Sequence, residues 1–293
     1  MAISTLRFAV IGDPVGHSKS PRMHGAAYAA LGLAHTYEAL PTRAAEVASR
    51  VAAVRGGAYA GLNVTVPHKQ AVLEHVDAID ESARAVGAAN TLVRDREGRV
   101  VAYNTDVPAL AAELTRLAPE RDAAGWADAG GLVLGSGGAA RAAIAALARL
   151  GARRICVRAR SLEKGRALEE VFRPTPDASG RAAVRIDVVV EPIDAGDRDA
   201  RFGAIVQATS AGMRGADDGE SVARAVAWSA LSPDAVALDV VYAPPETPFL
   251  RRAKGRGLRA DNGFGMLVGQ GALAFELWLG VRPPLDVMRA ALE

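Results

Sequence analysis

The sequence predicts an α/β protein made of two domains. Short strand-like runs alternate with longer helical runs along most of the chain, and this alternation implies right-handed crossovers and mostly parallel sheets. The chain has 293 residues, which fits one large domain or two modest ones. Half of the residues are hydrophobic and 23% are charged, a balance that excludes disorder. We therefore expect two α/β domains with a cleft between them.

The first half predicts strands separated by helices. The expected strands are Leu6–Ile11, His35–Leu40, Ala60–Val64, Asn90–Arg94 and Arg99–Tyr103, and the expected helices are Pro21–Leu33, Ala44–Arg55 and His68–Val76. Ser20 is the expected N-cap of the first helix, because Pro21 suits a first helical position whose N–H has no partner within the helix.

The alternation is clearer in the second half. The expected strands are Gly131–Leu134, Arg154–Val157, Val184–Val190, Ala204–Gln207 and Ala235–Val241, and the expected helices include Ala139–Leu150 and Phe264–Leu279. Glycine, proline and charged residues make 116–130 the expected surface junction between the halves. The acidic, glycine-containing stretch Gly215–Glu220 is expected to be a loop.

Composition excludes several classes of function. The 35 basic and 33 acidic residues nearly cancel, so the chain lacks the basic footprint of a nucleic-acid-binding protein. The single cysteine, Cys156, excludes an intramolecular disulfide and a cysteine-rich zinc site, and no histidine spacing implies a metal. No signal peptide and no apolar run of membrane-spanning length is present, so a cytoplasmic protein without membrane partners is expected.

A glycine loop in the second half is typical of dinucleotide binding. Residues 132–141 read as a buried strand, a G-x-G-x-x-A loop with Gly135, Gly137 and Ala140, and an alanine-rich helix. Such a loop lets the backbone approach a pyrophosphate, and the helix N-terminus faces its charge. A plain glycine turn is the alternative, but the flanking strand and helix favour the cofactor loop.

The residues after the next strand favour NADP over NAD. A NAD site would place an acidic residue there for the ribose hydroxyls. This chain has Arg158, Arg160, Ser161 and Lys164 instead, and guanidinium groups bind phosphate well. The alternative is that these cations are only solvated surface charge.

Small polar side chains gather in segments of the first half that lie at strand ends or helix starts. These segments are 12–24, 61–69, 87–91 and 103–106. Their hydroxyls, amides, one lysine and one carboxylate suit a small, polyhydroxylated, anionic molecule. Each segment alone could be an ordinary cap or turn, since Asn, Thr and Ser favour such positions.

Together, and in this order, these segments resemble the shikimate dehydrogenase family. The resemblance continues in Gln207–Met213, in Asp239–Pro244 with Thr247-Pro248, and in Gly263–Ala272 with Phe275 and Trp278, and it spans about residues 6–280. It implies reversible, NADPH-dependent reduction of 3-dehydroshikimate to shikimate, on the chorismate route to aromatic amino acids. It also implies a substrate-binding domain over 1–112, completed by 264–293, and a Rossmann-like NADP domain over 113–263. A homodimer is left open.

The resemblance also assigns roles to individual residues. Lys69 and Asp106 are implied as the catalytic pair. The implied substrate-binding residues are Ser18, Ser20, Asn63, Thr65, Asn90, Tyr242 and Gln270. The implied cofactor-binding residues are Gly135, Ser136, Gly137, Gly138, Ala139, Ala140, Arg160, Ser161, Lys164, Thr209, Val240, Gly263 and Met266. Helix Phe264–Leu279 is implied to close the cleft.

The residue types of the implied pair suit ketone reduction. Adding hydride to a carbonyl carbon requires a proton for the oxygen, and a positioned acid supplies it. An unperturbed lysine is an ammonium at neutral pH, and a neighbouring carboxylate fixes its position. A solvated lysine and a helix N-cap are the plain alternatives for Lys69 and Asp106. His17 and His68 are expected to hydrogen-bond backbone at turns, and Cys156 to be a core thiol.

The chain departs from the family pattern at three places. Ser136 replaces the usual alanine of the glycine loop, Gln207 replaces an asparagine, and Ala159-Arg160-Ser161 replaces an Asn-Arg-Thr motif.

Two other functions remain as alternatives. One is a quinate/shikimate dehydrogenase that uses NAD, which the lack of a strand-end acid disfavours. The other is a non-catalytic NADP-sensing paralogue, which should have lost Lys69 or Asp106.

Overall fold

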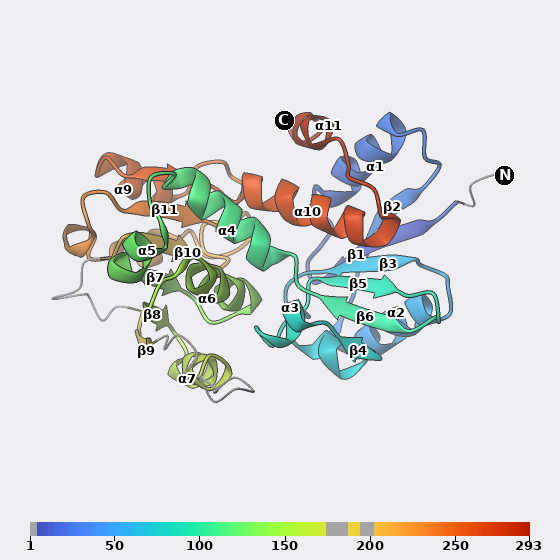
Figure 1. The fold of residues 1–293 in the computed structure, drawn as a ribbon, viewed down its shortest axis with the longest axis horizontal. Coiled ribbons are helices and arrows are strands. Elements are labelled where there is room, and N and C mark those ends of the chain that lie inside the picture. The colour runs from blue at the N-terminus through green and yellow to red at the C-terminus, as the bar shows by residue number, and fades with distance from the viewer. Residues whose placement is uncertain (1–4, 174–186, 194–201) are drawn as a thin grey trace. The chain divides into compact units, whose positions relative to one another are not determined.

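The computed structural model describes residues 5–173, 187–193 and 202–293, and these fold into two compact units. The first unit lies within residues 1–106 and 268–293, and the second lies within residues 107–267. Figure 1 labels the elements of both units. Helix α10, Phe264–Leu279, begins in the second unit and continues into the first.

The first unit is built on a mixed sheet. Its strand order is β2-β1-β3-β5-β6-β4, and β5 runs antiparallel to both neighbours while the other pairs are parallel. The strands are β1 Arg7–Gly12, β2 Thr36–Pro41, β3 Gly61–Val64, β4 Ala78–Ile79, β5 Thr91–Arg94 and β6 Val100–Tyr103. The helices are α1 Ser20–Ala30, α2 Val47–Arg55, α3 Glu81–Arg84, α11 Leu285–Ala290 and the 3₁₀ turns η1 Ala44–Glu46 and η2 Ala71–Glu74.

Helices cover both faces of this sheet, as the alternation of side chains in β1 requires. Ala9 and Ile11 belong to a core cluster with Val51 of α2. Phe8, on the opposite face, stacks on Trp278 of α10 with ring centroids 4.8 Å apart. Figure 1 shows α1, α10 and α11 together on one side of the sheet. The returning C-terminal helix therefore completes the core of the first unit.

The second unit has a fully parallel, doubly wound sheet. Its strand order is β12-β11-β10-β7-β8-β9, so the winding direction reverses between β7 and β10. The strands are β7 Gly131–Leu134, β8 Arg154–Ala159, β9 Asp187–Pro192, β10 Ala204–Gln207, β11 Val236–Asp239 and β12 Arg259–Asp261. The remaining elements are α4 Asp106–Leu117, α5 Ala123–Ala129, α6 Gly138–Leu150, α7 Leu162–Val171, α8 Glu220–Arg224, η3 Trp228–Ala230 and α9 Pro248–Gly255.

Two hydrophobic clusters sandwich this parallel sheet. One cluster joins Leu110 of α4, Trp126 of α5 and Ile144 of α6. The other joins Phe249 and Leu250 of α9 to the opposite face. Ligands of such open α/β sheets bind at the carboxyl ends of the strands where the winding reverses. The fold therefore places the predicted cofactor loop, which follows β7, at that point.

The α/β class is confirmed, and several predicted elements match to the residue. Strands Gly131–Leu134 and Ala204–Gln207 and helix Phe264–Leu279 have the expected bounds. The loop expected at Gly215–Glu220 is present up to Gly219, where α8 follows. Residues 184–186 of one predicted strand lie outside the described residues.

Other predictions about elements were wrong. Ser20 lies inside α1, whose N-cap is Lys19, and α1 ends at Ala30. The helix expected over His68–Val76 is only the 3₁₀ turn η2, in which Val72 alone is buried, and so short a segment lacks the packing that stabilises an α-helix. Residues 116–130 are not the junction between the two units, because the chain divides after Asp106, and they instead include α5 with its buried Trp126.

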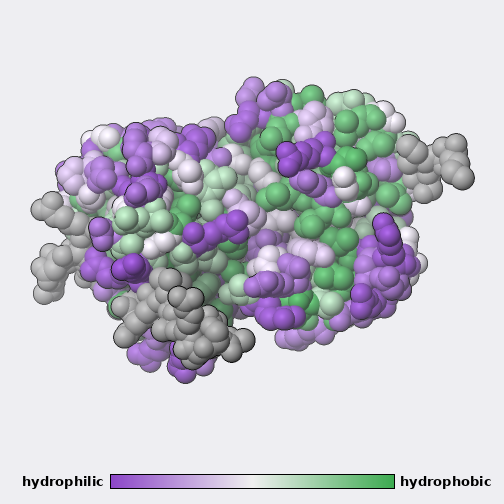
Figure 2. All heavy atoms as spheres, viewed as in Figure 1, coloured by the Kyte–Doolittle hydropathy of each residue, from purple (hydrophilic) through white to green (hydrophobic). Residues whose placement is uncertain are grey.

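Among the residues that the structure describes, nine large apolar side chains are exposed. Leu277, Val281 and Leu285, near the end of α10 and the start of α11, are among them. On the face drawn in Figure 2, hydrophobic residues occur over this part of the first unit, with polar residues around them. Such scattered exposure is ordinary for a globular surface. In the part of the chain that the structure describes, no helix is both long and apolar enough to cross a membrane.

Candidate active site

The predicted catalytic pair is formed in the first unit. Lys69 follows β3, and its Nζ lies 2.5 Å from Oδ2 of Asp106, the first residue of α4. The side chains are 14% and 3% exposed, respectively. The Asp106 backbone N–H donates to Oδ1 of Asn104, at 3.0 Å. The Asp106 carboxylate itself is bound by Lys69 and by Asn90.

Asn90 holds the other oxygen of the same carboxylate. Its Nδ2 donates to Oδ1 of Asp106 at 2.8 Å and to Oγ1 of Thr105 at 2.9 Å. Its Oδ1 accepts from the Thr105 backbone N–H at 2.7 Å, which fixes the amide orientation. Gln270 of α10 comes 3.4 Å from Asn90 Nδ2 through its Oε1. The structure thus brings the predicted catalytic pair, Asn90 and Gln270 into one polar cluster.

Asn63 extends this cluster across the sheet. Its Nδ2 donates to the Asn90 carbonyl and to Thr91 Oγ1, both at 3.1 Å, and its Oδ1 accepts from the Tyr37 hydroxyl at 2.7 Å. Tyr37 and Thr91 were not predicted as site residues. Thr91 could have been found, because it adjoins Asn90 in a polar segment. Tyr37 gave no signal, since a tyrosine in a strand is ordinary core material.

The residues expected to hold a carboxylate lie at the ends of two neighbouring strands. Ser18 and Ser20 follow β1, and Thr65 follows β3, its parallel partner. Ser18 Oγ accepts from the Ser20 backbone N–H at 3.2 Å, and the Thr65 N–H donates to the Ile11 carbonyl at 2.9 Å. Tyr242, the remaining predicted substrate residue, follows β11 in the second unit and is half-buried.

The glycine loop of the second unit is closely packed on one side and open on the other. Gly135 has a φ of +120°, and a Cβ there would come within 3.0 Å of the Ala208 carbonyl oxygen and the Thr209 side chain. A Cβ on Gly137, the N-cap of α6, would meet nothing within 4 Å. The loop therefore packs tightly against residues 208–209 on one side and is open at the helix N-terminus, where backbone N–H groups lack partners within the helix.

The cations after β8 differ sharply from one another. Arg160 and Lys164 are exposed, whereas Arg158 is fully buried and binds Glu191 Oε2 at 3.2 Å and the Ala225 carbonyl at 3.3 Å. Ser161 caps α7 by accepting from the Lys164 N–H at 3.3 Å. Arg160 and Lys164 can thus meet a 2′-phosphate, but the idea that Arg158 adds to such a site was wrong because its guanidinium is enclosed.

Gln207, where the family pattern has asparagine, organises the loop beside Gly135. Its Oε1 accepts from the Thr209 N–H and Oγ1 at 2.6 and 2.7 Å. Its Nε2 donates to the Ala211 carbonyl at 3.0 Å and to Asp239 Oδ1 at 3.2 Å. The longer glutamine therefore spans from the end of β10 to that of β11.

Asp239 is fully buried under this loop. Its carboxylate also accepts from the Val241 N–H at 2.9 Å and the Thr247 hydroxyl at 2.6 Å. Burial raises the pKa of Asp239 to about 7, because desolvation outweighs these hydrogen bonds.

The last predicted cofactor residues are arranged by close backbone packing. The Val240 N–H donates to the Gln207 carbonyl at 3.0 Å. A Cβ on Gly263 would come 2.2 Å from the Val240 carbonyl oxygen, so only glycine fits there. Met266, in the first turn of α10, belongs to the core cluster of the second unit.

His68, Cys156 and a surface hollow lie outside these clusters. Nε2 of His68 lies 2.6 Å from the Thr42 carbonyl, which confirms its predicted role at a turn, and Cys156 is a buried thiol.

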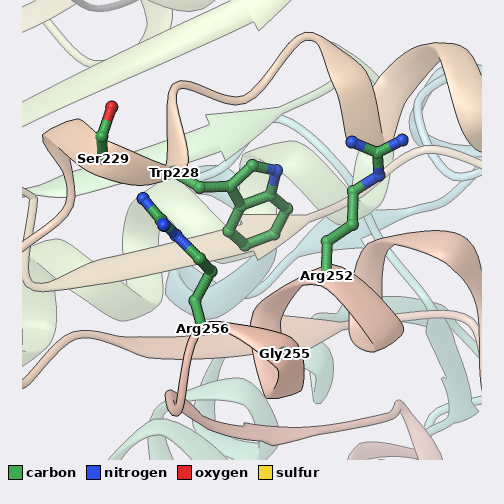
Figure 3. Close-up of a pocket in the computed structure, with 5 residues that line it drawn as sticks. All are labelled: Trp228, Ser229, Arg252, Gly255 and Arg256. Carbon is green, nitrogen blue, oxygen red and sulfur yellow. The ribbon is translucent and has the colours of Figure 1, made fainter.

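The surface hollow lies in the second unit and has a volume of about 440 Å³. It contains none of the predicted residues and is lined by Trp228, Ser229, Arg252, Gly255 and Arg256 (Figure 3). Within the described ranges, no group of three His, Cys, Asp or Glu side chains could hold a metal ion.

Comparison with known proteins identifies the family. A model of the shikimate dehydrogenase substrate binding domain matches residues 10–92, and one of the shikimate 5′-dehydrogenase C-terminal domain matches residues 263–293. The NADP(+) shikimate dehydrogenase of Geobacter metallireducens is 40% identical over 286 residues, which cover 96% of this chain and 93% of that protein. The chain belongs to the shikimate dehydrogenase family.

Solved structures of the family agree with this assignment. One of them is shikimate 5-dehydrogenase from Thermus thermophilus in complex with NADP(H) and shikimate. It is 36% identical to this chain, the match covers 98% of each chain, and the TM-score is 0.79. A 5-ketofructose reductase of Gluconobacter sp. strain CHM43 is 28% identical to this chain. That match covers 99% of each chain and has a TM-score of 0.80. Since the fold accommodates both enzymes, substrate choice has to be argued from the site.

Proposed function

We propose that this protein is an NADP-dependent shikimate dehydrogenase, which catalyses the reversible reduction of 3-dehydroshikimate to shikimate in chorismate biosynthesis. The observation that carries the proposal is the partly buried Lys69–Asp106 pair, 2.5 Å apart and fixed by Asn90. The proposal is also supported by sequence identity of 36–40% to NADP(+) shikimate dehydrogenases over nearly the whole chain. A non-catalytic cofactor-sensing paralogue does not need a proton donor, so the presence of this pair favours an enzyme.

Lys69 is the proton donor in this mechanism. Bound NADPH supplies the hydride that reduces the carbonyl carbon. The Lys69 ammonium gives its proton to the carbonyl oxygen as negative charge develops there, and the neutral amine regains a proton from solvent. Asp106 keeps the ammonium directed at one point and stabilises its charge, and Asn90 prevents the carboxylate from rotating. In shikimate oxidation the same amine removes the hydroxyl proton.

Each unit binds one of the two ligands. The first unit holds shikimate, with Ser18, Ser20 and Thr65 on the carboxylate and with Asn63, Asn90 and Gln270 on the ring hydroxyls. The second unit holds NADP through the glycine loop, residues 135–140, and through Arg160, Ser161 and Lys164 at the 2′-phosphate. The cofactor site of this unit also includes Thr209, Val240, Gly263 and Met266, and Tyr242 is its one predicted substrate residue.

Steady-state kinetics with purified protein tests the proposal. Shikimate and quinate are each assayed with NADP⁺ and with NAD⁺, and 5-ketofructose is assayed with NADPH. We expect kcat/KM to be highest for shikimate with NADP⁺. A higher value for quinate with NAD⁺, or for 5-ketofructose, would contradict the substrate assignment, and no turnover of any pair would favour a binding protein.

A homodimer and a cytoplasmic location stay predictions from the sequence and the resemblance. Sedimentation velocity measures the first, with a mass of 30.4 kDa expected for a monomer and twice that for a dimer.

A further inference from the structure

We propose that Tyr37 is a positioning residue, which donates to Oδ1 of Asn63 and so holds that oxygen in place to accept a hydrogen bond from a ring hydroxyl of the substrate. The inference rests on the proposed function, because it concerns how the same site reads its substrate. Tyr37 lies on β2, outside the polar segments that the sequence singles out, and its hydroxyl donates to Asn63.

The orientation of the Asn63 amide follows from its neighbours. A backbone carbonyl can only accept, so the group that faces the Asn90 carbonyl at 3.1 Å has to be Nδ2. The second hydrogen of Nδ2 points to Thr91 Oγ1, also at 3.1 Å. Oδ1 must then face Tyr37, and the phenol must donate to it across 2.7 Å.

This arrangement leaves Asn63 with one unused hydrogen-bonding position. Both hydrogens of Nδ2 are engaged, and one of the two lone pairs of Oδ1 is taken by Tyr37. A ligand can therefore use Asn63 only as an acceptor. A hydroxyl can donate to it, whereas a keto oxygen at the same ring position cannot. The site thus distinguishes the oxidation state at the ring position that faces Asn63.

The surroundings of Tyr37 preserve its role as donor. Burial raises the pKa of Tyr37 well above its usual range, so the phenol keeps its proton. Its ring stacks on His24 with centroids 4.3 Å apart and planes only 2° from parallel. Burial lowers the pKa of His24 to about 3, which keeps that ring uncharged.

Tyr37→Phe is the direct test, because it removes the hydroxyl and keeps the stacked ring. Tyr59→Phe is the matched control, since the Tyr59 hydroxyl binds Glu38 and Arg7 at 2.9 and 3.1 Å in the same unit. We expect Tyr37→Phe to raise KM for shikimate by about 3- to 10-fold, the value of one neutral hydrogen bond. kcat and the Kd for NADP⁺ should stay within about twofold of wild type, and the control should change none of them.

A double-mutant cycle separates positioning from a general structural effect. If Tyr37 acts through Asn63, Tyr37→Phe should leave the Kd for shikimate unchanged in an Asn63→Ala background, as measured by ligand-dependent thermal shift. The same weakening in both backgrounds would overturn the proposal, as would a lower melting temperature with unchanged KM. Failure of the wild type to oxidise shikimate would instead overturn the proposed function, so the two failures are distinguishable.

Discussion

The Lys69 ammonium is held from one side by Asp106, whose second oxygen is in turn held by Asn90. The Nζ–Oδ2 distance is 2.5 Å, and the Asn90 Nδ2–Asp106 Oδ1 distance is 2.8 Å. Both oxygens of the carboxylate are thereby fixed, and Asp106 is almost fully buried, whereas the Lys69 side chain is 14% exposed. A charge held in one geometry before the substrate arrives needs little reorganisation during reaction, which is the condition for efficient electrostatic and acid–base catalysis.

Replacement of Lys69, the proposed proton donor, tests this geometry directly. We expect Lys69→Ala to lower kcat by at least ~10²-fold, because general acid–base groups contribute mainly in the transition state. The Kd for NADP⁺ should not change, since Lys69 lies in the other unit from the glycine loop. Lys254→Ala is the control, because Lys254 only pairs with Glu246 on the surface at 3.3 Å. Activity within a few-fold of wild type would remove Lys69 from the catalytic role.

The two serines after β1 should affect substrate binding rather than turnover. Ser18→Ala and Ser20→Ala are each expected to raise KM for shikimate with little change in kcat, because a carboxylate is bound alike in the ground and transition states. Ser18→Ala should have the larger effect, since its Oγ also accepts from the Ser20 N–H. Ser49→Ala, on the surface of α2, serves as the control. A rise in KM for NADP⁺ instead would show that this loop does not hold the carboxylate.

Much of the site was predictable because its residues lie close together in sequence motifs. The G-x-G-x-x-A spacing around Gly135 is dictated by local backbone geometry, and the structure gives that glycine the positive φ that a tight turn requires. Asn90, Thr105 and Asp106 lie in short polar segments at strand ends, so their meeting follows from the sheet topology.

The remainder depends on tertiary packing that no local pattern contains. Tyr37 is indistinguishable in the sequence from a core aromatic, and only the pairing of β2 with β1 and of β1 with β3 carries it to Asn63. Arg158 and Arg160 are two residues apart, yet the first is buried within β8 and the second is exposed just beyond its end. The reach of Gln207 to Asp239 likewise depends on the adjacent ends of β10 and β11.

Arg160 is expected to determine cofactor preference. Arg160→Ala should weaken NADP⁺ binding by about 10- to 100-fold, the value of a charge-assisted hydrogen bond, and should hardly change binding of NAD⁺. Exposed Lys164 can compensate in part, which favours the lower figure, whereas Arg158 is locked against Glu191. Calorimetric titration with both cofactors checks this, with exposed Arg166→Ala as the control. Equal losses for both cofactors would place Arg160 at the pyrophosphate or in the fold.

The buried carboxyl of Asp239 should make the second unit less stable as the pH rises. Its pKa is raised to about 7 in the folded protein, whereas an unfolded aspartate titrates near 3.9. The folded state therefore holds its proton more tightly, so the stabilisation is complete below about pH 4 and is lost as the pH rises to about 7. Three pKa units correspond to at most about 4 kcal/mol.

Asp239→Asn isolates this effect, because the amide mimics the protonated carboxyl. Its oxygen can accept from the Val241 N–H and from Gln207, and its NH₂ can donate to Thr247 Oγ1 in place of the present Thr247-to-carboxylate bond. The melting temperature of the variant minus that of wild type should increase between pH 4 and pH 7 and be constant above pH 8.

Using this difference in melting temperature cancels the opposite trend expected from His24, whose lowered pKa destabilises the fold as the pH falls below about 6.5. Exposed Asp128→Asn is the control and should show no such trend. A difference that is flat from pH 4 to pH 9 would mean that Asp239 stays ionised under the loop, with Gln207, Val241 and Thr247 stabilising the charge.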